Sequence, residues 1–144
     1  MIELVKIFRE NLSNQISTLG NQVVPQDLRN FPAGTCEVSS VMLMTYLNSV
    51  GYKGISYISG SRPTVDPGKV SSHSCLKVNG KFLDITCSQF DECDELIIYA
   101  KSHPLLNSFS FTDNGFTDIY DYSNDGIIDY VPVYEAVLER MPST

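Results

Sequence analysis

The sequence predicts a domain that combines helices with an antiparallel β-hairpin, and two patterns support this. Apolar residues recur at three- and four-residue steps from Ile2 to Leu19, which is the spacing of an amphipathic helix. Asn79-Gly80 joins two segments, Ser72 to Val78 and Lys81 to Thr86, and this dipeptide is the strongest short-range signal for a two-residue hairpin turn. At 144 residues the chain is long enough for one core, so we expect a single domain over residues 1–144.

Composition and charge exclude several classes of partner. The net charge of −7, without a cluster of Lys or Arg, argues against binding to a nucleic-acid backbone and favours a protein or peptide partner. No apolar run approaches the roughly 20 residues that a membrane span needs. Lys6, Arg9 and Glu10 interrupt the apolar N-terminus, so we expect no signal peptide and a cytoplasmic protein, with any export through a dedicated secretion route. The sequence does not predict an oligomeric state.

Further elements follow from local patterns. Thr35 is placed to cap a helix that runs from Cys36 to Val50 and ends at Gly51. The other expected elements are a strand at Ile55–Ile58, a loop at Ser59–Ser71, a buried strand at Glu95–Ala100 and a helix at Val133–Met141, with residues 104–129 unassigned.

The hairpin turn fixes which side chains share a face of the sheet. If Asn79 and Gly80 form the loop, Val78 pairs with Lys81 and Leu76 pairs with Leu83. One face then carries His73, Cys75, Phe82, Asp84 and Thr86, and the other carries Leu76, Val78, Leu83 and Ile85. His73 and Asp84 become diagonal neighbours at roughly 7–8 Å between backbones, a distance that a carboxylate–imidazole hydrogen bond can bridge.

A nucleophile would complete this pair, and Cys36 is the candidate. A thiol at the first turn of a helix is favoured as thiolate, because the unpaired N–H groups and the helix dipole stabilise negative charge. Cys36 would attack an acyl carbon, His73 would accept the thiol proton and Asp84 would orient the imidazole. The Cys36 N–H is one oxyanion donor, and the second is the side-chain amide of Gln89, which we prefer, or of Asn30.

Two stretches, Phe31 to Ser40 and Ser72 to Phe90, resemble the core of the papain-like/transglutaminase-like cysteine enzyme superfamily. The glutamine that follows Asp84 is similar to one in the glutamine deamidase domain of a dermonecrotic bacterial toxin. The resemblance implies an α+β fold with the cysteine helix packed on an antiparallel sheet, a catalytic core at about residues 30–100, and Cys36, His73, Asp84 and Gln89 as site residues. Many relatives carry an aromatic residue where this chain has Cys75.

We therefore expect a thiol-dependent hydrolase or acyltransferase that acts on an amide bond of a protein or peptide through a Cys36 thioester. It would be a protease, a glutamine deamidase or a transglutaminase-like enzyme, in the manner of a bacterial effector. The alternative is a non-catalytic binding or inhibitory module with the same fold. Sequence does not choose between hydrolysis, deamidation and transfer, because all three share the thioester.

No cofactor or metal is expected. Cys75, Cys87 and Cys93 lack a Cys-x-x-Cys spacing, and we interpret them as reduced, buried residues. His103 falls in an expected loop without a partner. Residues 121–129 match the start of a calcium-binding EF-hand loop, but Pro132 stands where a bidentate Glu is required, so an acidic turn is the preferred interpretation.

Overall fold

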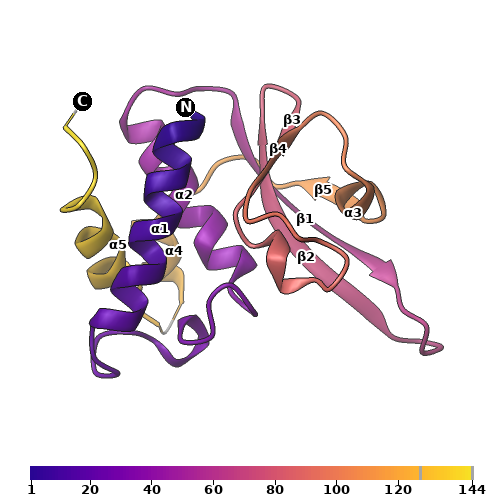
Figure 1. The fold of residues 1–144 in the computed structure, drawn as a ribbon, viewed down its shortest axis with the longest axis horizontal. Helices are drawn as coiled ribbons and strands as arrows, with labels where there is room; N and C mark the ends of the chain where they lie inside the picture. The colour runs from indigo at the N-terminus through magenta and orange to yellow at the C-terminus, as the bar shows by residue number, and fades with distance from the viewer. Residues whose placement is uncertain (127, 144) are drawn as a thin grey trace.

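The structure is a computed structural model that describes residues 1–126 and 128–143, and it is an α+β fold with a five-stranded antiparallel sheet (Figure 1). The helices are α1 (Ile2–Thr18), α2 (Cys36–Ser49), α3 (Pro104–Asn107), α4 (Ile119–Asp125) and α5 (Val131–Leu138), with short 3-10 turns η1 (Gln26–Leu28) and η2 (Cys87–Gln89). The strands are β1 (Ile55–Pro63), β2 (Val70–Val78), β3 (Lys81–Asp84), β4 (Ile98–Ala100) and β5 (Ser110–Asp113).

The predicted hairpin is confirmed with its register. The strands of the sheet follow the order β4-β3-β2-β1-β5, and β2 pairs with β3 through Leu76 with Leu83 and Val78 with Lys81. Asn79 and Gly80 have φ angles of 50° and 82°, and a type I′ turn requires positive φ at both positions. The local sequence of the turn therefore determines which side chains share each face of β2 and β3.

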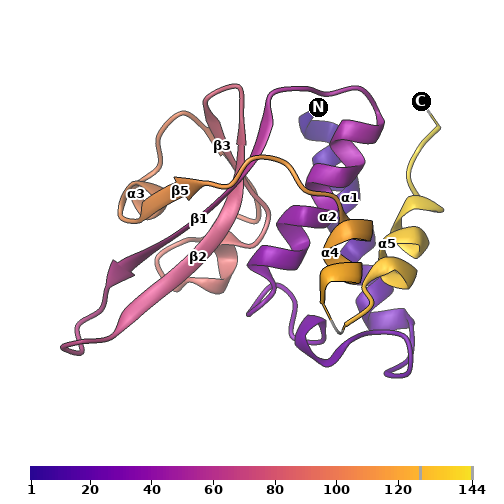
Figure 2. The ribbon, with the colours of Figure 1, turned by 180° about the vertical axis from the view of Figure 1, so that it is seen from behind.

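Four helices cover one face of the sheet. Figures 1 and 2 show α1, α2, α4 and α5 gathered on one side, with α2 nearest the strands. Side chains from Val38 to Leu47 on α2 are all buried, because this helix lies between the sheet and the outer helices. From the sheet, this core receives Leu76, Val78, Leu83 and Ile85, which is the set predicted for that face.

The opposite face of the sheet is covered by the chain between β3 and β5. A second apolar cluster forms there around Cys75 and Phe82, and it includes Ile58, Cys87, Cys93, Ile98, Leu105, Leu106 and Phe109. Residues 104–129, which sequence patterns left unassigned, supply α3, β5 and α4. The sheet is thus the middle of three layers, and its second face is buried without a long helix.

Two strands differ in length from the sequence expectation. β1 continues past Ile58 to Pro63, and β2 begins at Val70, so the expected loop at 59–71 contracts to residues 64–69. Ser59, Gly60 and Ser61 have low strand propensity, but β1 pairs along this stretch with β2 on one side and β5 on the other. The strand expected at Glu95–Ala100 is shorter in the structure, where β4 begins only at Ile98. Leu96 is exposed, and Ile98 is the one buried residue of β4, so the apolar run does not form a fully buried strand.

None of the helices within residues 1–126 and 128–143 is both long enough and apolar enough to cross a membrane.

Gly60 tests the packing of β1 against β5. Gly60 faces Phe111 in the register of these strands, and a methyl group added there would collide with the Ser110 carbonyl oxygen. We expect Gly60→Ala to lower the unfolding free energy by roughly 1–3 kcal/mol, as overpacking does. Gly20→Ala is the control, because nothing lies within 4 Å of the added methyl group. Urea denaturation would show the difference, and equal losses in the two variants would contradict this packing.

Candidate active site

His73 and Asp84 form a buried pair on the sheet. Each residue is only 1% exposed, and His73 Nε2 lies 2.6 Å from Asp84 Oδ2. The other carboxylate oxygen, Oδ1, accepts a hydrogen bond from the Thr86 N–H at 2.8 Å. The diagonal relation predicted from the hairpin register is therefore confirmed, and each Asp84 oxygen has its own donor.

An aromatic wall separates this pair from solvent. The Phe90 ring meets the His73 ring edge-on at 4.9 Å between centroids, and the Phe109 ring lies 5.6 Å away. The Arg62 guanidinium lies over both phenylalanine rings, donates to Ser108 Oγ at 2.8 Å and forms an ion pair with Glu92. Sequence reasoning missed these residues, because they come from β1 and two separate loops and share no local signal.

Cys36 is the first residue of α2 and is half-buried. Burial raises the pKa of its thiol, but the nearby His73 imidazole and the polar groups of Ser74 outweigh burial. The pKa of Cys36 is therefore lowered from its ordinary value. The structure thus brings Cys36 together with His73, although 36 residues of sequence separate them.

The His73 pKa moves in the opposite direction. Burial disfavours the imidazolium, but the hydrogen bond to Asp84, the nearby Cys36 thiol and the charges of both groups raise the pKa to about 9. Nδ1 is buried and forms no hydrogen bond within the described part of the chain. Because Asp84 engages Nε2, Nδ1 is the nitrogen left to exchange a proton with the thiol. The two opposite shifts both favour a thiolate–imidazolium pair over a neutral pair.

The pairing of β2 with β3 does not reach His73, which leaves room for the start of α2 to approach this residue. β2 pairs with β3 only from Leu76 to Val78, while β1 accompanies β2 along its whole length. The tip of α2 can therefore approach β2 at His73 and Ser74. The Tyr57 hydroxyl on β1 lies 3.0 Å from Ser74 Oγ and extends the polar network behind the thiol. Neither Ser74 nor Tyr57 was predicted.

The first turn of α2 lacks the side-chain cap expected from Thr35. Thr35 holds the N-cap position, but its hydroxyl donates to the Pro32 carbonyl at 2.9 Å and accepts from Ser39 Oγ at 3.1 Å. The predicted capping bond is therefore wrong, because the buried Thr35 hydroxyl bonds to Pro32 and Ser39 instead of a backbone N–H of the helix. Free N–H groups at the helix start suit a thiolate or an oxyanion.

Gln89 lies next to the loop that precedes Cys36. Its Oε1 accepts from the Gly34 N–H at 3.4 Å, and its Nε2 donates to Thr86 Oγ1 at 3.3 Å. The side chain links η2 to the cysteine loop, and a role as oxyanion donor stays a prediction. Asn30, the alternative donor, is exposed.

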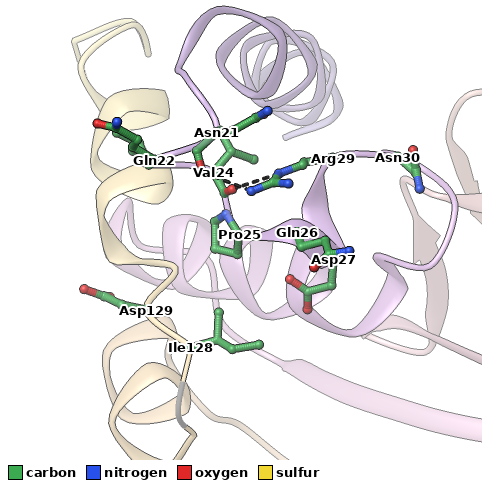
Figure 3. A pocket seen from close by; sticks show the side chains of 11 residues that line it. Asn21, Gln22, Val24, Pro25, Gln26, Asp27, Arg29, Asn30, Ile128 and Asp129 are labelled. Carbon is green, nitrogen blue, oxygen red and sulfur yellow. Dashed lines mark hydrogen bonds between the residues drawn. The ribbon is translucent and has the colours of Figure 1, made fainter.

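A large open cavity lies beside η1, and Asn30 stands at its edge. It has a volume of about 810 Å³ and is lined by residues 21–27, Arg29, Asn30, Ile128 and Asp129. Figure 3 shows Arg29 turned inward, where it donates to the carbonyls of Val24 and Asn21 and holds the loop together. Cys36, His73 and Asp84 are not among its lining residues, so this cavity is separate from the catalytic candidates.

The remaining sequence predictions have mixed outcomes. Cys75, Cys87 and Cys93 are free and buried, as predicted. His103 lies outside helices and strands as expected, but the expectation that it lacks a partner is wrong, because it caps α3 through Leu105 N and its Nε2 lies 2.6 Å from Glu95 Oε1. Residues 121–125 belong to α4, so the start of the EF-hand match is helical rather than a loop, and residue 127 lies outside the described residues.

Comparison with family models, curated proteins and solved structures finds no match to this chain.

Asp84→Asn tests the electrostatics of the pair. Asn offers one acceptor oxygen in place of two, so it cannot serve both His73 and the Thr86 N–H. We expect the His73 pKa to fall below about 9, because burial is then opposed by Cys36 alone. Imidazole NMR titration would measure the shift.

The same variant carries a stability prediction with a defined sign. His73 has a raised folded-state pKa, so its stabilisation is complete below pH 6.5 and is lost as pH rises through about 9. Asp84→Asn should cost roughly 3–5 kcal/mol below that window and less above it. Asp113→Asn is the matched control, because Asp113 also accepts two hydrogen bonds but is exposed. A pH-independent loss in Asp84→Asn would refute the charged pair.

Proposed function

We propose that the protein is a thiol-dependent hydrolase or acyltransferase that acts on an amide bond of a protein or peptide through a Cys36 thioester. The observation that carries this proposal is the buried His73–Asp84 pair beside a thiol whose pKa is lowered. A nucleophile, a base and a group that orients the base are the three parts that nucleophilic acyl transfer requires. The papain-like/transglutaminase-like core remains part of this proposal.

The reaction follows from the positions of the protons. His73 Nδ1 takes the thiol proton, and Cys36 Sγ attacks the amide carbon, whose oxygen becomes an oxyanion stabilised by N–H groups at the start of α2. The imidazolium then protonates the leaving amine as the carbon–nitrogen bond breaks. Asp84 holds the Nε2–H throughout and so fixes which nitrogen exchanges the proton.

The substrate amide and the acceptor of the second half-reaction together decide between the three activities. Water that attacks the thioester gives peptide hydrolysis if the amide was a peptide bond, and deamidation if it was a glutamine side chain. A substrate amine gives transfer instead. The net charge of −7 favours basic or neutral protein substrates over acidic ones.

The pH profile of Cys36 alkylation by iodoacetamide tests the thiolate. In wild-type protein, the alkylation rate of Cys36 should rise with pH around a pKa lower than that of an ordinary thiol. His73→Ala should slow alkylation at neutral pH by about tenfold or more, since a normal thiol is only a few per cent thiolate there. His103→Ala is the control, because His103 is the other histidine and contacts Glu95 rather than Cys36. Near-ultraviolet circular dichroism would verify that each variant is folded.

Acylation by a small activated ester tests the chemistry without knowledge of the substrate. Wild-type protein should gain one acyl group in intact-mass measurements and lose it on addition of hydroxylamine. Over the same reaction time, Cys36→Ser should gain no acyl group. Fragments of a test protein would then indicate peptide hydrolysis. With a glutamine peptide, conversion to the glutamate peptide would identify water as the acceptor, and incorporation of a fluorescent amine would identify an amine. Equal alkylation rates in wild type and His73→Ala, with no acylation, would instead favour a non-catalytic binding module.

A further inference from the structure

A second group of reactive side chains lies outside the Cys36 site. Ligand atoms of Cys93, Glu95 and His103 lie within 4.8 Å of one another, which no part of the proposed reaction uses. Cys93 is buried and His103 is half-buried, so the cluster is not a chance meeting of exposed charges. Sulfur, nitrogen and carboxylate oxygen are together the donor set that zinc prefers in proteins.

Cys87 lies beside this group and is the candidate for a fourth donor. The thiols of Cys87 and Cys93 both point at the Glu95 carbonyl oxygen, at 3.2 Å and 3.8 Å. Two thiols, one carboxylate and one imidazole therefore converge from a segment of only 17 residues.

We propose that Cys87, Cys93, Glu95 and His103 bind one zinc ion. In a tetrahedral zinc site with bonds of about 2.0–2.3 Å, neighbouring ligand atoms lie roughly 3.3–3.8 Å apart. The limit of 4.8 Å holds for Cys93, Glu95 and His103, and these three require contraction by about an ångström through side-chain rotation. Cys87 lies outside that group and must move farther to take the fourth position of a tetrahedral structural site.

A cavity gives the ion a path to the ligands. It has a volume of about 660 Å³, and Cys93, Glu95 and His103 lie on its wall. Glu92 and Asp94, also on the wall, place negative charge at the entrance and attract a cation.

Binding exchanges protons for the ion. Cys87 and Cys93 each lose a thiol proton on forming bonds to zinc, so the ion displaces two protons. His103 Nδ1 now accepts from the Leu105 N–H at 3.1 Å, which places the ring proton on Nε2, toward Glu95. Coordination through Nε2 moves that proton to Nδ1, and the Leu105 contact at the start of α3 must open.

The ion would also fix the chain that covers the catalytic pair. Phe90, which meets the His73 ring, lies between Cys87 and Cys93 in sequence. A bond from zinc to each flanking cysteine would hold this loop against the sheet. The zinc site itself does not depend on the proposed enzyme activity.

Cobalt titration of the full chain tests the site. The measurement uses Cys36→Ser protein, so that metal bound by the Cys36–His73 pair is not counted. One equivalent of Co²⁺ should produce thiolate-to-cobalt charge-transfer absorption and the visible bands of tetrahedral cobalt, and Zn²⁺ should displace it. Native mass spectrometry should show one bound zinc, and zinc should raise the melting temperature.

Further substitutions in this protein distinguish the proposed zinc ligands from other residues. Cys93→Ser and Glu95→Gln should each weaken zinc binding by about tenfold or more, as loss of a coordinating or supporting group does. Cys75→Ala and Asp113→Asn are the thiol and carboxylate controls, because neither residue lines the cavity, and both variants should bind zinc as before. Absence of the charge-transfer band in folded Cys36→Ser protein, or a band that Cys93→Ser leaves unchanged, would overturn the proposal.

Discussion

The hydrogen bond between His73 and Asp84 is the interaction on which the site depends. Both residues are almost completely buried, and an ionisable group in such a position is costly unless it is paired and hydrogen-bonded. Asp84 meets this requirement because one of its oxygens lies 2.6 Å from His73 Nε2 and the other accepts from the Thr86 N–H. The pair stabilises the fold and, at the same time, leaves only Nδ1 to meet a thiol.

The layers of the fold explain why such a pair can persist. The helical layer carries the cysteine, whereas Phe90 and Phe109 cover the histidine from the other face of the sheet. Cys36 comes from the helical layer, whereas the His73 side chain lies on the opposite face of the sheet. The two residues approach each other where β2 extends beyond its pairing with β3. Arg62 stacks on both phenylalanine rings and closes this cover without burying an unpaired charge, because Glu92 and Ser108 receive its guanidinium.

Local sequence predicted the parts of the site that depend on local geometry. The Asn79-Gly80 turn permits only one register, and that register alone brings His73 beside Asp84. The start of α2 at Cys36 was also predictable, although the capping bond from Thr35 was not, because tertiary contacts claim its hydroxyl.

The rest arises from contacts between distant segments. β1 extends through Ser59, Gly60 and Ser61 only because two neighbouring strands supply its hydrogen bonds. The cover of Arg62, Phe90 and Phe109 has no sequence period to reveal it. The meeting of Cys87, Cys93, Glu95 and His103 is equally hidden, since their spacing matches no zinc-binding pattern and only the turn of the chain around η2 and α3 brings them together.

The account is tested most directly by the ultraviolet absorbance of the Cys36 thiolate as a function of pH, taken as the difference between wild type and Cys36→Ser. If the imidazolium of His73 stabilises the thiolate, the absorbance should appear with a midpoint below the roughly 8.5 of a free cysteine. A midpoint at or above that value would show that the buried pair does not act on the thiol, and the proposed chemistry would fail with it.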